Sequence, residues 1–299
     1  MHVRPSRKGT MPFGEYGTWY RVTGDLAAER PALVVVHGGP GSTHDYLLNL
    51  ADLAAETGCP VVHYDQIGNG GSTHLPDSDA DFWTVQLFLD ELDNLLTGLG
   101  IADNYVLFGQ SWGGPLAARH AADAPRGLRG LVIANASASY PLWRQEMDVL
   151  RAQLPPGVNE TLLRHEAAGT TNTPEYFEAM KVFYDKHVCR LDPWPRDYQA
   201  SFYEVYNDST VYFTMNGPSE FHVTGTLRDW SVESRLPDIE APTLLISGRY
   251  DEATPATVQP YQDLIPDVRW ELFQESSHLP HLEEPELFRA VMTDFLKNL

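Results

Sequence analysis

The serine at position 111 lies in a sequence context that could make it a nucleophile. Residues 109–114 read Gly-Gln-Ser-Trp-Gly-Gly, which matches the G-x-S-x-G pattern. The apolar run at 105–108 precedes the match and an alanine-rich run at 115–122 follows it, so we expect a sharp turn from a strand into a helix. Glycines on both sides of the serine let two backbones approach where a Cβ would clash. The hydroxyl would then be held out at the end of the strand.

A nucleophilic serine needs a base, which is usually a histidine oriented by a carboxylate. Two later strand-like runs lead into such groups: Asp251 follows residues 243–247, and His278 follows residues 270–273. The order serine, acid, histidine is typical of parallel sheets that carry this kind of turn. His281 is an alternative base, but His278 lies closer to its strand and is preferred.

A glycine-rich loop follows the apolar run at 33–36. Residues 37–41 read His-Gly-Gly-Pro-Gly, and such a loop can turn the N–H of Gly39 towards a reacting carbonyl. Together with the N–H of Trp112, the residue after the serine, it would form an oxyanion hole. His37 itself is expected to pack or hydrogen-bond within the loop, and the glycine-rich loop at 65–72 is given a structural role.

These motifs must be positioned by a regular framework, and the chain alternates between strand and helix patterns. Short apolar runs recur at 33–36, 61–64, 105–108, 130–134, 243–247 and 270–273. An apolar stripe at i, i+3, i+4 spacing between residues 82 and 96 predicts a helix, and Pro285 opens another. This rhythm predicts an α/β fold with a mostly parallel sheet and helices on both faces. Residues 16–23 are expected to add an antiparallel edge strand.

The rhythm breaks between two core strands. Residues 140–235 contain helix-like pieces and many aromatic residues but no clear strand-like run. An insertion at this point would lie over the carboxyl ends of the strands, where open α/β sheets bind ligands. We therefore predict a core formed by residues 1–139 and 236–299, interrupted by a mainly helical cap at 140–235.

The composition argues against several function classes. The net charge of −20 disfavours nucleic acid or an anionic membrane as a partner and indicates a solvated acidic surface, or else a preference for cationic substrates. No apolar stretch approaches the roughly 20 residues that span a bilayer. Residues 1–10 lack the apolar segment of a secretory signal, which suggests a cytoplasmic location. Cys59 and Cys189 show no metal-like spacing, and we expect neither a metal nor a cofactor.

Taken together, the motifs resemble the proline iminopeptidase family, a group of serine peptidases with the α/β-hydrolase fold. The resemblance runs from about Pro12 to the end of the chain, and the His-Gly-Gly-Pro-Gly loop is its most specific element. It is carried by residues 37–41, 65–72, 109–114, 215–221, 225–230 and 277–285.

The resemblance implies an enzyme that removes an N-terminal residue, commonly proline, from a small peptide through an acyl-enzyme. Amino-acid amidases and amidohydrolases acting on aminoacylated natural products are related. In this family two glutamates bind the free amino group of the substrate, and Glu220 and Glu252 match them. The implied partner is therefore a small peptide or aminoacyl amide with a free amino group.

Two alternatives remain open at this point. An esterase or natural-product amidase could use the same three catalytic residues, tolerate a blocked amine and have an elongated apolar pocket. A ligand receptor on the same fold would bind without turnover. The sequence indicates neither the preferred first residue nor the oligomeric state; Trp143, Tyr206, Phe213 and Trp230 are candidates for the pocket walls.

Overall fold

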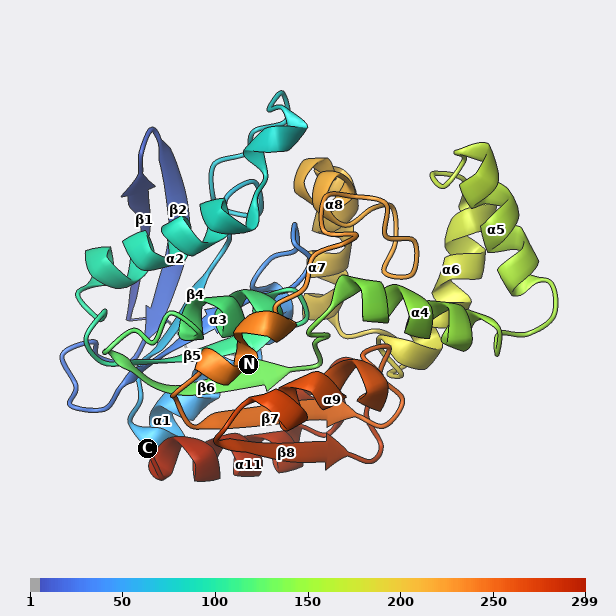
Figure 1. Cartoon of the computed structure of the whole chain (residues 1–299). Helices are drawn as coiled ribbons and strands as arrows, with labels where there is room; N and C mark the ends of the chain where they lie inside the picture. Colours follow the sequence, from blue (N-terminus) through green and yellow to red (C-terminus); the bar gives the residue numbers. More distant parts are fainter. Residues whose placement is uncertain (1–5) are drawn as a thin grey trace.

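The computed structural model describes residues 6–299 and is built around an eight-stranded sheet (Figure 1). The strand order is β1-β2-β4-β3-β5-β6-β7-β8. β1 and β4 both pair antiparallel with β2, and every pair from β4 to β8 is parallel. The bounds are β1 (Arg7–Phe13), β2 (Tyr16–Thr23), β3 (Ala32–Val36), β4 (Val61–Tyr64), β5 (Tyr105–Gln110), β6 (Leu128–Ala134), β7 (Thr243–Gly248) and β8 (Val268–Phe273).

The central strands form because their residues are apolar on both faces. Every residue of β3, β4, β5 and β7 is buried, as expected for parallel strands covered on both sides. All the strands predicted from apolar runs are present, and the prediction of a mostly parallel α/β sheet is confirmed. The structure extends β5 to Gln110 and begins β6 and β8 two residues earlier than predicted.

The N-terminal edge of the sheet differs from the prediction. Residues 16–23 do form an antiparallel strand, but β1 pairs along the outer side of β2 and is the actual edge. β1 alternates between exposed and partly buried residues and contains Lys8, Gly9 and Pro12. Polar, flexible residues of this kind are typical of edge strands and give no apolar run to detect.

Helices cover both faces of the sheet (Figure 1). On one face α2 (Val85–Leu99) and α3 (Gly113–Ala121) contact each other; on the opposite face α1 (Leu53–Thr57) contacts α11 (Pro285–Lys297). α2 begins where the Thr84 side chain accepts a hydrogen bond from the N–H of Leu87, and it ends at Gly100, whose φ is 72°. The predicted apolar stripe of this helix faces the core.

Five α-helices lie between β6 and β7, and residues 140–235 contribute no strand to the sheet. Figure 1 shows them grouped beyond the carboxyl ends of the strands. They are α4 (Tyr140–Arg151), α5 (Val158–Ala168), α6 (Pro174–His187), α7 (Arg196–Asn207) and α8 (Thr210–Met215). The remaining helical elements are η1 (Asp45–Asp52), η2 (Ala80–Phe82), η3 (Glu233–Asp238), α9 (Pro255–Leu264) and α10 (Pro280–Glu283).

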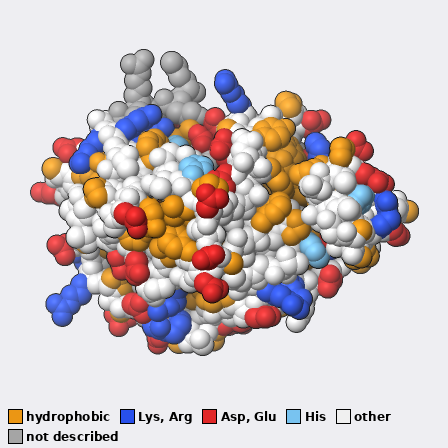
Figure 2. All heavy atoms as spheres, turned by 90° about the horizontal axis from the view of Figure 1, so that it is seen from above, with side chains coloured by type: hydrophobic (Ala, Val, Ile, Leu, Met, Phe, Trp, Pro, Cys, Tyr) orange, Lys and Arg blue, Asp and Glu red, His pale blue; other side chains and the backbone are white. Residues whose placement is uncertain are grey.

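The surface reflects the acidic composition. In the view from above, acidic side chains are scattered over the face and are interspersed with a few basic ones (Figure 2). This distribution fits a solvated acidic surface better than one concentrated binding patch. Within residues 6–299, no helix has the length and apolar character required to cross a membrane.

Candidate active site

Ser111 occupies a strained turn between β5 and α3. Its φ is 54°, in the left-handed region that a residue with a side chain rarely adopts. The neighbouring backbones are so close that a Cβ on Gly109 would lie 2.1 Å from the carbonyl oxygen of Gly113. A Cβ on Gly113 would lie 2.1 Å from the carbonyl oxygen of Val36. Only glycine fits at these two positions, which explains why the sequence pattern requires it.

His278 and Asp251 form a buried pair at the ends of the next strands. The distance from His278 Nδ1 to Asp251 Oδ1 is 2.7 Å. The same oxygen accepts the N–H of Ala253 at 2.8 Å, and Asp251 Oδ2 accepts Asn135 Nδ2 at 2.6 Å. Burial lowers the pKa of His278, but the charge and hydrogen bond of Asp251 outweigh it, so the net pKa is raised.

Ser111 and His278 line one cavity, although within residues 6–299 no hydrogen bond joins their side chains. His281 points elsewhere: its Nε2 lies 3.0 Å from the carbonyl oxygen of Tyr46, and burial lowers its pKa to about 3. Neutral and enclosed, this ring acts as a packing residue.

The glycine-rich loop after β3 lies against Ser111. Gly39 has a φ of 112° and, with Trp112, lines a second cavity that also includes Ser111. No acceptor within residues 6–299 is hydrogen-bonded to the N–H of Gly39 or of Trp112. The His37 ring is buried, accepts the N–H of Gln66 at Nε2 (3.0 Å), and has a pKa lowered to about 4 by burial. As expected, His37 organises the loop.

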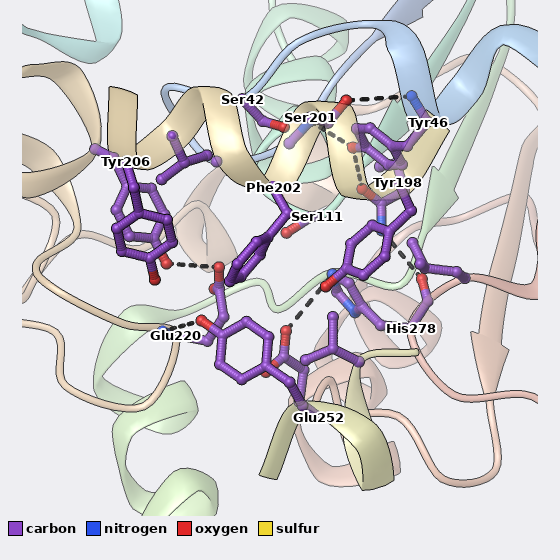
Figure 3. A pocket seen from close by; sticks show the side chains of 18 residues that line it. Ser42, Tyr46, Ser111, Tyr198, Ser201, Phe202, Tyr206, Glu220, Glu252 and His278 are labelled. Atoms are coloured by element: carbon purple, nitrogen blue, oxygen red, sulfur yellow. Dashed lines mark hydrogen bonds and ion pairs between the residues drawn. The ribbon is translucent and has the colours of Figure 1, made fainter. Parts of the chain in front are cut away.

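Two carboxylates, Glu220 and Glu252, line the same cavity (Figure 3). Glu252 adjoins Asp251 and is fully buried, yet neither of its carboxylate oxygens has a hydrogen-bond partner within residues 6–299. Its Oε1 lies 3.7 Å from His278 Nε2. Glu220 follows α8 and accepts the hydroxyl of Tyr212 at 2.6 Å. Burial raises the pKa of both carboxyl groups, and Glu220 raises that of Glu252 further.

The space between the residues that line this cavity, including its open mouth, is about 520 Å³. Of the four candidate wall residues, Tyr206 lines this cavity and Trp143 lines the second one. Phe213 and Trp230 are in neither lining: Phe213 is 40% exposed, and the Trp230 ring packs 5.9 Å from that of Trp112. A run of aromatic residues cannot reveal which rings face inward, because that depends on how the helices dock.

Sequence reasoning missed three residues that organise the site. Asn135 holds Asp251, and the hydroxyl of Tyr46 donates to Gln110 beside Ser111. Two of them carried a detectable signal. Asn135 is a polar residue directly after a buried strand, and Gln110 is the variable position of the nucleophile motif. Tyr46 carried no signal that sequence patterns could detect.

Within residues 6–299, no group of three or more histidine, cysteine, aspartate or glutamate side chains could hold a metal ion.

The fold and this site define an α/β-hydrolase, and the family described as the alpha/beta hydrolase fold matches residues 31–285. A proline iminopeptidase of Heyndrickxia coagulans is 37% identical over 267 residues, covering 89% of this chain and 91% of that protein. The solved structure of a proline iminopeptidase from Mycobacterium smegmatis is 53% identical, with a TM-score of 0.90 and 98% of each chain covered. The crystal structure of VinJ is 68% identical, with a TM-score of 0.98, covering 99% of this chain and all 100% of that one.

The chain belongs to the proline iminopeptidase family of α/β-hydrolases and is a hydrolytic enzyme. The family predicted from the motifs is therefore confirmed.

Proposed function

We propose that this enzyme releases an N-terminal amino acid from a peptide or aminoacyl amide that has a free amino group. The released residue is proline or another small apolar residue. One observation carries the proposal: Glu220 and Glu252 face the cavity that contains Ser111 and His278. A buried carboxylate without a partner is costly, and a substrate ammonium would supply the missing charge and hydrogen bonds. The relatives' name, proline iminopeptidase, supports the same substrate class.

The first half of the reaction forms an acyl-enzyme. Ser111 Oγ attacks the carbonyl carbon of the first residue while its proton passes to His278 Nε2. Asp251 stabilises the resulting imidazolium across the 2.7 Å contact. The unpaired N–H groups of Gly39 and Trp112 hold the oxyanion. Removing one such donor typically costs about 3 to 4 kcal/mol of transition-state stabilisation.

The second half releases the amino acid. The tetrahedral intermediate collapses, the C–N bond breaks, and His278 gives its proton to the leaving amine. Water then attacks the ester on Ser111 with His278 again taking a proton, and the free amino acid leaves. Each proton is returned, so the cycle uses only the chain and water.

The carboxylates also explain why cleavage would occur only at an N-terminus. With the ammonium held by Glu220 and Glu252, a single carbonyl lies within reach of Ser111. A peptide bond further along the chain would have no ammonium at that distance, so the site would select exopeptidase cleavage. Both the position of the cut and the need for a free amine would follow from one charged pair.

We further propose that residues 140–235 act as the cap and that residues 1–139 and 236–299 form the core; residues 1–5 lie outside the described structure. The cap would contribute Glu220, Tyr206 and Tyr212 to the cavity, whereas the core carries the nucleophile and the base. On this division the nucleophile and the base come from the core, and the proposed amine-binding carboxylates come from both parts, Glu220 from the cap and Glu252 from the core.

The proposal is tested with proline, alanine and leucine arylamides, each with its amine free or acetylated. We expect turnover of free amines and its loss on acetylation, because an acetylated amine carries no charge for the carboxylates to bind. Ser111→Ala is the blank and should lower the rate by several orders of magnitude. Comparable turnover of acetylated substrates would contradict the proposal.

A matched pair of variants isolates the carboxylates. Glu252→Gln keeps the shape but removes the charge, and should raise KM and lower kcat/KM for free-amine substrates. Glu91→Gln is its control, because Glu91 is equally buried but lies outside both cavities. Equal activity of the two variants would leave Glu252 without its proposed role.

A second candidate function is hydrolysis of an aminoacyl amide, and it differs from the first only in the amine that leaves. Part of the cap side of the cavity is apolar, where Val188, Phe202 and Val205 line it, and Phe202 also borders a separate hollow lined by cap residues between 177 and 203. This lining favours an aminoacyl amide whose amine carries a long apolar chain, as in an aminoacylated natural product. Lengthening the alkyl chain of alanyl alkylamides should lower KM in this case and leave it unchanged for a peptidase.

A further inference from the structure

One buried hydroxyl connects the three loops that carry the proposed catalytic groups. Tyr46 lies in η1 and is 5% exposed. Its hydroxyl accepts the N–H of Gly38 at 2.8 Å and donates to Gln110 Oε1 at 2.5 Å. Gln110 Nε2 in turn donates to the carbonyl oxygen of His278 at 3.1 Å. A continuous chain therefore runs from the oxyanion loop through the nucleophile turn to the loop of the base.

The oxyanion loop and the nucleophile turn are in direct contact at this point. A Cβ on Gly38 would lie 2.9 Å from Ser111 Cβ, 3.0 Å from the Tyr46 hydroxyl oxygen and 3.1 Å from Gln110 Oε1. Gly38 therefore packs directly against Ser111, and the hydroxyl of Tyr46 lies on the side of Gly38 where a side chain would otherwise be. A shift of this loop would carry the adjacent N–H of Gly39 with it.

Tyr46 is itself held from both ends of its backbone. Its N–H donates to Ser201 Oγ of α7 at 3.2 Å, and its carbonyl oxygen lies 3.0 Å from His281 Nε2. Figure 3 shows Tyr46 beside Ser201 at the wall of the cavity. The backbone of Tyr46 is therefore held by a helix of the insertion and by the segment that follows His278, and this fixes where its hydroxyl lies.

We propose that Tyr46 and Gln110 are positioning residues that set the distances between the oxyanion donors, Ser111 and His278. This inference rests on the proposed function of those groups. An oxyanion hole works only when its donors lie about 2.7 to 3.1 Å from the developing charge. Loss of the hydroxyl leaves the N–H of Gly38 and the amide oxygen of Gln110 buried without partners, so the loops must shift to satisfy them.

Such a role predicts an effect on kcat rather than KM, because Glu220 and Glu252 remain in place. The test uses Tyr46→Phe and Gln110→Met, which remove the hydrogen bonds with little change of volume. Tyr105→Phe is the matched control: Tyr105 is buried, its hydroxyl lies 2.6 Å from His120 Nε2, and it stands at the opposite end of β5. Thermal midpoints of all variants report the general cost of losing a buried hydroxyl interaction.

The primary readout is the rate at which diisopropyl fluorophosphate labels Ser111. In this reaction the Ser111 proton passes to His278, an O–P bond forms, the P–F bond breaks and fluoride leaves. The reagent has no amine, so the amino-group site is not involved. Tyr46→Phe should slow labelling and kcat by about tenfold or more, with KM for a free-amine arylamide within about threefold of wild type. The double variant should be no slower than the slower single one, because both interrupt one chain. Tyr105→Phe should stay within about twofold of wild type.

The inference is overturned if Tyr46→Phe keeps both its labelling rate and its kcat within about twofold of wild type. It is also overturned if Tyr105→Phe lowers these two rates as much as Tyr46→Phe does. Failure of the proposed function is distinguishable. Wild type that is labelled at Ser111 but cleaves no aminoacyl amide contradicts the substrate and leaves the labelling comparison valid. A wild-type Ser111 that is not labelled at all overturns both proposals.

Discussion

At the scale of single residues, Asp251 and Glu252 show how different surroundings give two adjacent acidic residues different roles. Asp251 is surrounded by donors, which are the His278 ring, the N–H of Ala253 and the amide of Asn135. Glu252 is just as buried, but neither of its oxygens has a hydrogen-bond partner within the described residues. The first environment holds the carboxylate of Asp251 where it orients the imidazole of His278. The second favours an acid that binds a cation on arrival.

Because the pKa of His278 is raised, we can predict how the reactivity of Ser111 depends on pH. The base must be neutral to accept the serine proton, and Asp251 stabilises the charged ring. The rate of labelling by diisopropyl fluorophosphate should therefore rise with pH, with its midpoint above the ordinary histidine value of 6.5. The reagent has no amine, so substrate titration does not intervene. A midpoint at or below 6.5 would contradict the assigned pairing.

At the scale of elements, two buried acids hold the loop at residues 65–72: Asp65 of the loop itself and Glu91 of α2. Asp65 accepts both the N–H and the Nδ1 of His44, at 2.9 and 2.7 Å. From α2, Glu91 accepts the N–H of Ile67 on both oxygens, at 2.9 and 3.0 Å, and the hydroxyl of Thr18 at 2.5 Å. The loop, α2 and β2 are joined by one buried carboxyl group. This supports the structural role predicted for the loop.

Glu91 should make stability depend on pH. Burial raises its pKa from 4.5 to about 7. Between these values the folded protein keeps a proton that the unfolded chain releases, so folding stability falls as pH rises, by up to about 3 kcal/mol. Glu91→Gln cannot ionise and should lose this decline in urea unfolding curves measured from pH 4.5 to 7.5. Asp90→Asn, an exposed charge on the same helix, is the control. An unchanged decline in Glu91→Gln would refute the assignment.

At the scale of the whole molecule, polar contacts tie the helical insertion to the sheet domain. His74 lies in the segment after β4, and its Nδ1 is 2.5 Å from Asp208 Oδ2, between α7 and α8. Its Nε2 is 3.1 Å from the carbonyl oxygen of Gly70. Two acceptors around one ring require both nitrogens to carry protons. A second link joins the Thr43 and Ser201 hydroxyl groups at 2.9 Å.

The His74 contact should therefore strengthen in acid. Partial burial lowers the pKa of His74, but the hydrogen bond and charge of Asp208 outweigh this, so the net pKa is raised above 6.5. Its contribution to stability is complete below pH 6.5 and is lost as pH rises through the folded-state value. Thermal midpoints from pH 5.5 to 8.5 should fall less in His74→Gln than in wild type. Parallel curves would show that the contact adds nothing.

Much of the fold and the candidate site could be predicted because the informative patterns are local. Each apolar run buries a strand, and parallel strands bring their carboxyl ends to one edge of the sheet. A residue's distance along the chain from its strand therefore predicted where Ser111, Asp251 and His278 would lie. β1 could not be predicted in this way, because an exposed edge strand needs no apolar run.

Sequence patterns were enough to predict the central strands of the sheet, the family, and the chain positions from which a nucleophile, an acid and a base could meet. Three-dimensional packing, by contrast, established which of the 41 acidic residues are buried and which rings of the insertion face inward. It alone brought Tyr46 and Asn135 to residues far along the chain. The difference arises because strand and helix patterns depend on residues that are close in sequence. Burial, pKa and hydrogen-bond partners depend on residues that are close in space and can be far apart along the chain.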